Sequence, residues 1–593
     1  MLVKARNLSY SLNLATVFVL LISGCAGVEN ASEPEPKSFD QIKQSELQYY
    51  DPQQSIGLAL SGGGTRSASF HIGVLAGLNQ ISHLENIDII SSVSGGSYAA
   101  YWYFSKLYYQ SLYDTNDSPN DLFSFCYSNP EVLDEGDIKC TNDATKERRF
   151  QRHLSNNSLI LKKHALGSQE DNDIHFGHFI PIALRTIVEA PTSNVLEFFG
   201  SDNNLYSARD YYREGLERTY GLYPAPTNTK GFMKESFLGE DDSLYRSQTG
   251  HKYRAESLYL LEFQKQLYSE PNQNNTPPLW VINTTVAPSN DFRFTRLYTN
   301  PYKTEPFSNS IYEITPFSVG SGTTGYLSIS DANKMHCQLM GDGNHCLRTI
   351  SDYVALSGAA VDVTPYTGFG GTIGLTLASI LGIELGDYSL NPTEYSQPAY
   401  LSDGGHSDNL GAYSLIKRGV KKIIISDAEK DSKGEAEGLR RLAKQLMGEG
   451  KKIVFYHGKD KKPIEELNSC LYSDDSQCMT IAYDERPDSK RKARDWELEP
   501  VLRANVQASD GTILHQIYYI KLRALDRYRQ EAQQLGYVPY SNGTTYLISN
   551  ENDTDRFPHV STMDINFSPT QYFAYFNTGR FYGKVLKNYL EEY

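Results

Sequence analysis

The amino-acid pattern predicts an α/β fold in which a parallel β-sheet is covered by helices. The apolar run Ile56–Leu60 is typical of a buried strand, and a helical stripe of apolar residues follows it. A second unit repeats this order, with a strand at Ile87–Ile90 and a helix at Ser97–Tyr108. Two strand–turn–helix units in succession favour parallel strands beneath a layer of helices.

Charge and composition narrow the class of protein. The chain has 593 residues, with 56 Lys and Arg against 71 Asp and Glu, and a formal net charge of −15. Nucleic-acid-binding proteins usually carry a basic surface, so this charge argues against a nucleic-acid partner. Hydrophobic residues make up 39% and charged residues 21% of the chain, which excludes a disordered polyelectrolyte and leaves ample material for a core.

More elements are predicted along the rest of the chain. The further strands are expected at 280–286, 423–426, 453–456 and 513–520, and the last helix at 572–590. Between residues 109 and 277 the strand pattern disappears, which predicts a helical or loop insertion, or a cap, inside the α/β core. Gly73 and Gly77 lie four residues apart, so we expect them to let the first helix lie close on the sheet.

The N-terminus predicts export and lipidation. Two basic residues precede the apolar run Leu14–Ile22, which is too short to span a bilayer but suits the core of a signal peptide. The run ends in a segment that resembles a bacterial lipobox, in which Cys25 would be acylated and become the first mature residue. An ordinary signal peptide with a chance cysteine is the alternative. Residues 1–24 are therefore predicted to be a lipoprotein signal peptide.

The segment after the lipobox predicts where the protein works. Residues 25–53 carry an alternating Glu-Pro stretch and are interpreted as a flexible tether. Ala26 after the cysteine resembles signals for the outer membrane. We expect a bacterial envelope protein that is anchored to a membrane through acylated Cys25, facing the periplasm or the exterior. The sequence points to no particular protein partner.

The six remaining cysteines form three close pairs in the sequence. An exported protein meets an oxidising compartment, and pairing of sequence neighbours is the most economical connectivity. Metal binding is the alternative, but no pair is followed by histidine at zinc-site spacing. The expected disulfides are Cys126–Cys140, Cys337–Cys346 and Cys470–Cys478.

A glycine-rich turn, Gly62-Gly63-Gly64, follows the first predicted strand and is followed in turn by Arg66. Consecutive glycines let several backbone N–H groups converge, and the start of a helix adds positive potential, so the turn can bind a phosphate or an oxyanion. A phosphate-binding P-loop would require Gly-Lys-Ser/Thr, which is absent. A tight turn with a purely structural role is the alternative.

Two further turns contain candidate catalytic residues. Ser94 is central in Ser92-Val93-Ser94-Gly95-Gly96, which matches a nucleophile elbow except that Ser92 replaces the first glycine. Asp403 precedes two glycines at the end of a predicted strand, where a carboxylate could accept a proton directly from a serine. The alternatives are a helix start capped by hydroxyl groups and an Asx turn, respectively.

These three segments, in this order, resemble the patatin-like phospholipases and the related cytosolic phospholipases of animals. The resemblance implies an α/β patatin-like three-layer sandwich with a central, mainly parallel sheet and a helical insertion. It divides the chain into a first core part at 54–108, the insertion at 109–277 and a second core part at 278–458. A C-terminal extension at 459–593 is expected to pack on the core. The matching segments are Leu60–Leu75, Ser92–Tyr103, Ser402–Gly419, Thr315–Gly322, Ser357–Pro365 and Phe557–Thr562.

The resemblance also implies residue roles. Ser94 would be the nucleophile and Asp403 the general base of a Ser–Asp dyad that cleaves acyl esters of membrane glycerophospholipids. The oxyanion hole would be formed by the backbone N–H groups of Gly62, Gly63 and Gly64. Arg66 would balance phosphate or oxyanion charge. No metal and no organic cofactor is implied.

Other interpretations stay open at this point. A neutral-lipid esterase or a transacylase could use the same dyad, whereas a non-catalytic binding protein would be expected to have lost the nucleophile or the base. His406 invites a Ser–His–Asp triad, but it lies only three residues from Asp403, an unfavourable spacing for a relay. His71 is expected to pack against the sheet.

Overall fold

The computed structural model describes most of the predicted core, and Lys37–Tyr593 belongs to one compact unit. The described residues are 35–112, 213, 216, 220–221, 258–269, 277–286, 306–340, 348–359, 387–389, 399–431, 433–458, 462–475, 494–523, 557–560, 562 and 569–591.

A mixed sheet of 13 strands, counted over the described residues, runs through this unit. Its five central strands are parallel to one another. In spatial order these are β13 (Ile513–Lys521), β9 (Lys422–Asp427), β1 (Ile56–Leu60), β2 (Ile87–Val93) and β3 (Leu279–Val286). The predicted parallel core is therefore confirmed, and the predicted strands lie at these places or, for 453–456, in the flanking strand β10.

Antiparallel strands extend the sheet on both flanks. Beside β13 lie β12 (Leu502–Ala508), β10 (Lys451–His457) and β11 (Lys462–Pro463). Beside β3 lie β4 (Ile311–Ile314), β5 (Ser318–Ser321) and β6 (Gly325–Ser328). The sheet is thus parallel at its centre and antiparallel at its edges.

One short strand lies where the carboxyl ends of the central strands meet. β8 (Ala399–Asp403) pairs with the last residues of β3 and with β7 (Asp387–Ser389). β4 already occupies one edge of β3 there, so β8 takes the edge that β2 occupies further back. Asp403 pairs with Thr284, next to the residue that pairs with Val93 at the end of β2. This register places the end of β8 beside the end of β2.

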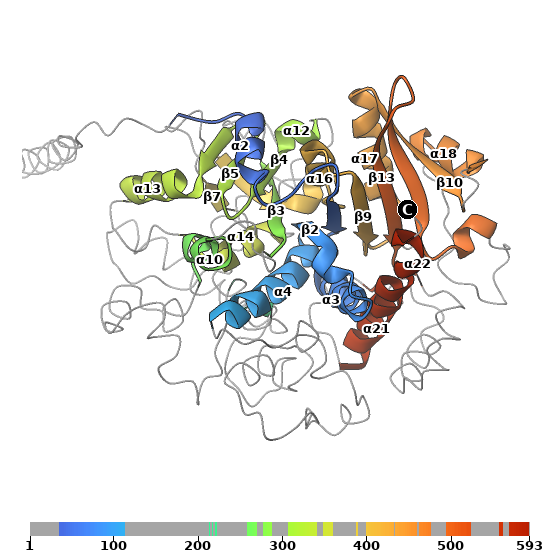
Figure 1. The fold of residues 1–593 in the computed structure, drawn as a ribbon, viewed down its shortest axis with the longest axis horizontal. Coiled ribbons are helices and arrows are strands. Elements are labelled where there is room, and N and C mark those ends of the chain that lie inside the picture. Colours follow the sequence, from blue (N-terminus) through green and yellow to red (C-terminus); the bar gives the residue numbers. More distant parts are fainter. Residues whose placement is uncertain are drawn as a thin grey trace, which may run out of the picture. The chain divides into compact units, whose positions relative to one another are not determined.

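Successive side chains of each central strand point to opposite faces of the sheet, and apolar residues lie on both faces. Helices therefore cover both faces. In β1, Leu58 and Leu60 enter one core while Ala59 enters the other. The first core packs beneath α3 (Gly64–Gln80), α4 (Gly95–Leu112), α10 (Leu260–Leu267), α14 (Ile350–Ser357) and α21 (Pro569–Val585). The second packs beneath α16 (Tyr413–Arg418), α17 (Glu437–Gly448) and α18 (Glu465–Tyr472). Figure 1 shows α3, α4 and α21 together. Because helices pack on both cores, the predicted three-layer arrangement is confirmed.

Shorter helices complete the described part of the chain. They are α2 (Phe39–Glu46), α12 (Phe307–Ser310), α13 (Ile329–Met340), α22 (Lys587–Leu590) and the 3₁₀ turns η2 (Leu84–Asn86), η9 (Gly404–His406) and η11 (Asp495–Leu498). Of the predicted insertion at 109–277, the described residues are 109–112 at the end of α4, 213, 216, 220–221, 258–269 around α10, and 277, and the rest lies outside the described residues.

The two glycines of α3 face another helix and not the sheet, which corrects the sequence-based expectation. A Cβ added to Gly73 would lie 2.0 Å from the carbonyl oxygen of Phe576, and one added to Gly77 would lie 2.4 Å from that of Arg580. Both carbonyls belong to α21, whose own Gly579 would meet the carbonyl of Phe70 at 1.9 Å. The two backbones therefore cross almost in contact, a packing that sequence alone did not reveal because α21 lies about 500 residues downstream of α3.

The expected tether is not flexible throughout, because its second half is folded onto the core. Ser38 caps α2 through a capping box with Gln41, and Lys37 pairs with Tyr326 beside β6. Glu46 is fully buried and forms a two-point ion pair with Arg418 of α16, at 2.9 and 3.1 Å. The flexible tether predicted for 25–53 is thus wrong from residue 37 onward.

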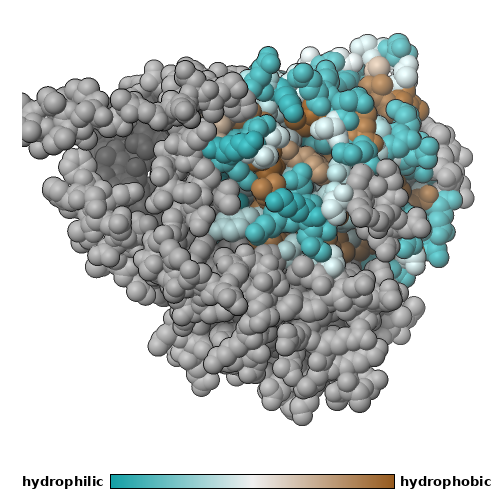
Figure 2. Space-filling view, turned by 60° about the vertical axis from the view of Figure 1, so that its left-hand side comes forward, coloured by the Kyte–Doolittle hydropathy of each residue, from teal (hydrophilic) through white to brown (hydrophobic). Residues whose placement is uncertain are grey.

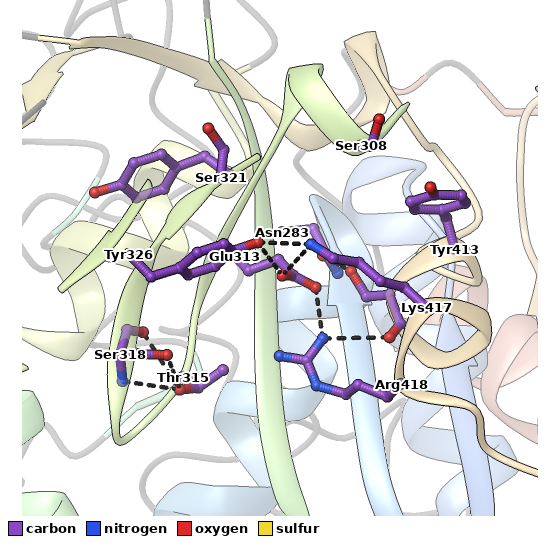
Figure 3. A network of polar contacts seen from close by, with 12 residues as sticks. Asn283, Ser308, Glu313, Thr315, Ser318, Ser321, Tyr326, Tyr413, Lys417 and Arg418 are labelled. Carbon is purple, nitrogen blue, oxygen red and sulfur yellow. Dashed lines mark hydrogen bonds and ion pairs between the residues drawn. The ribbon is translucent and has the colours of Figure 1, made fainter. Parts of the chain in front are cut away.

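A buried polar network surrounds Arg418 and joins α2, β4, β6 and α16. Figure 3 shows the part of it that Glu313, Tyr326, Lys417 and Arg418 form. Its guanidinium contacts Glu313 at 2.5 Å, and Lys417 donates to Glu313 at 3.1 Å and to the hydroxyl of Tyr326 at 2.6 Å. Burial alone would raise the pKa of Glu313, but the charges of Arg418 and Lys417 outweigh it and hold this pKa well below its ordinary value. Burial is the dominant influence on Glu46 and raises its pKa despite Arg418.

The described surface carries only scattered apolar residues. Large hydrophobic side chains that are exposed among the described residues are Met447, Leu498 and Ile513. On the face drawn in Figure 2, hydrophilic and hydrophobic residues are interleaved over the described part. No broad apolar surface is therefore visible in that part of this face.

Candidate active site

Ser94 occupies a sharp turn between β2 and α4. Its φ is 49°, a left-handed conformation that is uncommon for residues other than glycine. A Cβ on Gly95 would lie 2.1 Å from the carbonyl oxygen of Gly64, and one on Gly96 would lie 2.2 Å from that of Leu60. The two glycines thus let the chain turn back against the end of β1. This geometry agrees with the predicted nucleophile elbow.

Asp403 lies within hydrogen-bond distance of Ser94. The hydroxyl of Ser94 donates to Asp403 Oδ2 at 3.1 Å, and the N–H of Gly405 donates to Oδ1 at 2.7 Å. The hydroxyl of Thr285 donates to the main-chain oxygen of Asp403 at 2.7 Å, which fixes the end of β8 on β3. Both Ser94 and Asp403 are buried, at 5% and 6% exposure. A carboxylate so placed can accept the proton of the hydroxyl without an intervening imidazole.

The glycine turn, Gly62–Gly64, packs against the turn that contains Ser94. Gly63 and Gly64 have φ of 140° and 62°, and α3 begins at Gly64, so the turn leads directly into the helix N-terminus. The N–H of Gly62 donates to the carbonyl of Asn409 at 2.8 Å and is therefore engaged inside the protein. This N–H is not available to an oxyanion, which corrects the prediction for Gly62. In the described part of the chain no protein acceptor engages the N–H groups of Gly63 and Gly64, and their role as oxyanion donors stays a prediction.

Arg66 is fully buried beneath the same turn. Its Nε donates to the carbonyl of Ala428 at 3.0 Å, and a second guanidinium nitrogen donates to the carbonyl of Val560. Arg66 therefore connects the glycine turn with the residue after β9 and with the C-terminal segment. Its expected action on phosphate or oxyanion charge stays a prediction.

Polar residues that the sequence analysis did not single out support the elbow from behind. The N–H of Ser94 donates to Ser357 Oγ at 2.9 Å, and Ser357 donates to the carbonyl of Asn283 at 2.7 Å. Asn283 in turn donates to Ser91 Oγ at 2.9 Å and to the carbonyl of Ser92 at 3.1 Å. A signal for Ser357 was present, since it begins one of the family-like segments, but its partner is 263 positions away.

Two further carboxyl groups have raised pKa values. Asp408, in the loop after Asp403, accepts the N–H groups of Leu410 and Tyr413, which caps the start of α16, and burial raises its pKa to about 6. Glu429 follows β9, and burial, together with the nearby charge of Asp427, raises its pKa to about 7.

The histidines do not stand between Ser94 and Asp403. His406 Nδ1 contacts Ser402 Oγ at 3.2 Å, while the serine and the aspartate contact each other directly. His71 is fully buried, and its Nε2 donates to the carbonyl of Ser426 at the end of β9. The expectation that His71 packs on the sheet is confirmed. Burial lowers its pKa to about 3, so the ring is neutral.

Most of the cysteines predicted to carry a lipid or to form disulfides are not described by the structure. Cys470 is buried in α18 and is disulfide-bonded, but its expected partner Cys478 lies outside the described residues, so the pairing stays a prediction. Outside the described residues, or with side chains that are not described, are Cys25, Cys126, Cys140, Cys337 and Cys346.

The described residues contain neither a candidate metal site nor a candidate membrane-spanning helix. No group of three or more His, Cys, Asp or Glu side chains in that part could hold a metal ion. Among the described helices, none has the length and the apolar composition that crossing a membrane requires.

Comparison with protein families gives one match. Residues 58–242 match the model of the family described as patatin-like phospholipase. The matched segment contains the glycine turn, Arg66 and Ser94, and it ends before Asp403. No curated protein matched the chain.

Solved structures that match the chain include human GIVD cytosolic phospholipase A2, with 10% identity, a TM-score of 0.44, and coverage of 93% of this chain and 62% of that chain. A structure of that protein with methyl gamma-linolenyl fluorophosphonate matches with 10% identity, a TM-score of 0.45, and coverage of 93% and 61%. VipD from Legionella pneumophila matches with 12% identity, a TM-score of 0.21, and coverage of 69% and 57%. This chain spans about three fifths of the length of the human chains.

Proposed function

We propose that this chain is a serine lipid acyl hydrolase of the phospholipase A or lysophospholipase type, because residues 58–242 match the patatin-like phospholipase family. Its substrates would be acyl esters of membrane glycerophospholipids. The observation that carries the proposal is the 3.1 Å hydrogen bond from Ser94 Oγ to Asp403 Oδ2, formed at a left-handed elbow beside the glycine turn. Support comes from the order of the three segments and from their meeting at one edge of the sheet.

The proposed reaction has two halves. Asp403 takes the hydroxyl proton as Ser94 Oγ attacks the ester carbonyl carbon, and the oxyanion is stabilised by the N–H groups of Gly63 and Gly64. Collapse of the tetrahedral species breaks the ester C–O bond, and the lysophospholipid oxygen leaves with the proton from Asp403. Water, deprotonated by Asp403, then attacks the acyl-enzyme, so that the fatty acid departs and Ser94 regains its proton. Loss of a single oxyanion donor costs roughly 10²–10³ in rate in comparable enzymes.

We also propose that acylated Cys25 anchors the protein in the bacterial cell envelope. The basis is the N-terminal sequence, in which an apolar signal core precedes a lipobox-like segment. An anchor of this kind would keep the catalytic unit at a phospholipid surface, where its substrate is concentrated.

The test is fatty acid release from mixed phospholipid micelles by the full chain. Ser94→Ala and Asp403→Asn should each abolish release, because the first removes the nucleophile and the second the base. Ser469→Ala and Asp510→Asn, which change exposed residues of the same types, serve as matched controls and should retain full activity. A Cys25→Ala arm should retain activity on micelles while the protein moves from the membrane to the soluble fraction.

The same assay separates the competing functions. A short-chain neutral ester as second substrate identifies an esterase if it alone is cleaved, and a lysophospholipid acceptor identifies a transacylase if acyl groups are moved and not released. Retained activity of Ser94→Ala or Asp403→Asn would contradict the dyad. Complete inactivity of the folded wild-type protein on all substrates would contradict the enzymatic proposal.

A further inference from the structure

Asn409 lies between the two turns that carry the proposed chemistry. It belongs to the loop that follows Asp403, and its main-chain oxygen accepts the N–H of Gly62 at 2.8 Å. Its Oδ1 is so close to the backbone that an added Cβ would lie 2.1 Å from it on Gly62 and 2.6 Å from it on Gly405. Real Cβ atoms do not approach this closely, so only glycines leave room for the amide. The side chain of Asn409 therefore touches both the glycine turn and the aspartate loop.

Glu429 fixes the other end of this amide. Asn409 Nδ2 donates to Glu429 Oε1 at 2.8 Å, and Glu429 Oε2 accepts the N–H of Gly438 in the first turn of α17 at 3.1 Å. The N–H of Glu429 itself donates to Asp427 Oδ1 at the end of β9, at 2.8 Å. Both carboxylate oxygens and the backbone are thus engaged, so that Glu429 can adopt few other orientations and orients Asn409 in turn.

We propose that Asn409, oriented by Glu429, is a positioning residue that sets the separation between the oxyanion donors and the Ser94–Asp403 pair. This inference rests on the proposed function, because it names the part that these two residues play in the same site.

A bridge between the two turns matters because they are attached to different strands. The glycine turn follows β1, whereas Asp403 is the last residue of β8, and these strands are not neighbours in the sheet. Asn409 bridges them with one main-chain hydrogen bond and with the contacts of one side chain. Displacement of reacting groups by about 1 Å can cost about 10²-fold in rate, so a bridge of this kind should act on turnover more than on substrate binding.

The experiment measures two rates for each variant. The first is fatty acid release, resolved into kcat and KM. The second is the rate of covalent labelling of Ser94 by a long-chain fluorophosphonate, in which Oγ bonds to phosphorus, fluoride leaves and Asp403 takes the proton. Asn409→Ala should lower kcat and the labelling rate by about 10²-fold, with KM changed by less than about threefold.

A paired exchange distinguishes positioning from general support of the fold. Asn409→Asp alone opposes two carboxylates and should be as slow as Asn409→Ala or slower. When Glu429→Gln is added, the new amide nitrogen can donate to the new carboxylate while its oxygen still accepts the N–H of Gly438. We therefore expect the double variant to exceed Asn409→Asp by at least about tenfold in both rates. Asn86→Ala and Glu465→Gln, at exposed positions, are matched controls that should leave both rates unchanged.

The outcomes are separable from those of the proposed function. If the wild type releases no fatty acid but its Ser94 is labelled, the proposed function fails, and the inference stands or falls on the labelling rates of the variants. A double variant no faster than Asn409→Asp, a change confined to KM, or a loss that matches the loss of folded protein by circular dichroism would each overturn the inference. Absence of labelling at Ser94 in the wild type would overturn both.

Discussion

The backbone at Ser94 adopts a φ of 49° although the residue has a side chain. Such a conformation costs of order 1–3 kcal/mol and persists only where the surroundings enforce it. Here the N–H of Ser94 is fixed by Ser357 and its hydroxyl by Asp403. The strain is therefore balanced by contacts that also aim the hydroxyl at the aspartate.

His71 gives a pH dependence at the same scale. Burial lowers the pKa of its ring to about 3, whereas an unfolded histidine titrates near 6.5. Below pH 6.5 the unfolded chain therefore binds a proton that the folded one refuses, and stability falls as the pH falls toward 3. We expect the free energy of unfolding, measured with urea, to lose about 2 kcal/mol more between pH 7.5 and pH 5 in the wild type than in His71→Asn. Equal pH dependence in the two proteins would contradict this, and their difference at pH 7.5 gives the separate packing cost.

Among the elements, the two strand–turn–helix units are connected by contact between their turns. Gly95 at the start of α4 meets the backbone of Gly64 at the start of α3, and the hypothetical Cβ would contact both the carbonyl oxygen and the nitrogen, at 2.1 and 2.7 Å. Neither atom can move without moving the turn itself. The position of Ser94 relative to the glycine turn thus depends on the absence of one methyl group.

Gly95→Ala should therefore separate the two turns. We expect kcat for fatty acid release to fall by at least about 10²-fold and the free energy of unfolding to fall by about 1–3 kcal/mol from overpacking. Gly448→Ala is the matched control, because a Cβ there meets nothing within 4 Å. This control should keep full activity and be as stable as the wild type or slightly more so. Unchanged activity of Gly95→Ala would show that the turns tolerate separation.

Across the whole molecule, segments from the two ends of the compact unit pack near the candidate site. α21 packs on α3 through glycines on both helices, and Val560 accepts a hydrogen bond from Arg66 beneath the glycine turn. At the other end, α2 is attached through the ion pair of Glu46 with Arg418, whose helix α16 follows the aspartate loop. Both termini of the compact unit are therefore structurally connected to the loops of the site.

Arg418→Met tests this attachment, because it leaves Glu46 and Glu313 buried without their shared cation. Removing one partner of a buried ion pair typically costs 3–5 kcal/mol, and we expect a loss of about that size in the free energy of unfolding at pH 8. The loss should be smaller at pH 5, because carboxyl groups that lack the cation can take up protons. Lys444→Met, in the exposed pair with Asp474, is the control and should leave stability nearly unchanged. A loss at pH 8 no larger than that of the control would contradict the anchoring role.

Local elements of the fold could be predicted from the sequence, whereas most contacts between distant residues could not. The strands and helices around Leu60, Ser94 and Asp403 were predictable, because apolar periodicity and glycine-rich turns are local signals. The contact between Ser94 and Asp403 was predictable only through a family resemblance, since the two residues are 309 positions apart. The roles of Ser357, Asn409 and α21 could not be predicted, because each depends on a partner far away in the chain.

The sequence by itself determined the class of fold, the order of the main elements and the residue types at the turns that carry Ser94 and Asp403, since periodicity and turn chemistry are properties of neighbouring residues. Only the tertiary structure decided which polar groups already have partners within the protein and which segments pack against one another. It showed that the N–H of Gly62 is used by Asn409, that Glu46 anchors a segment expected to be free, and that Gly73 faces a helix. Each of these depends on a distance across the fold, which no local pattern records.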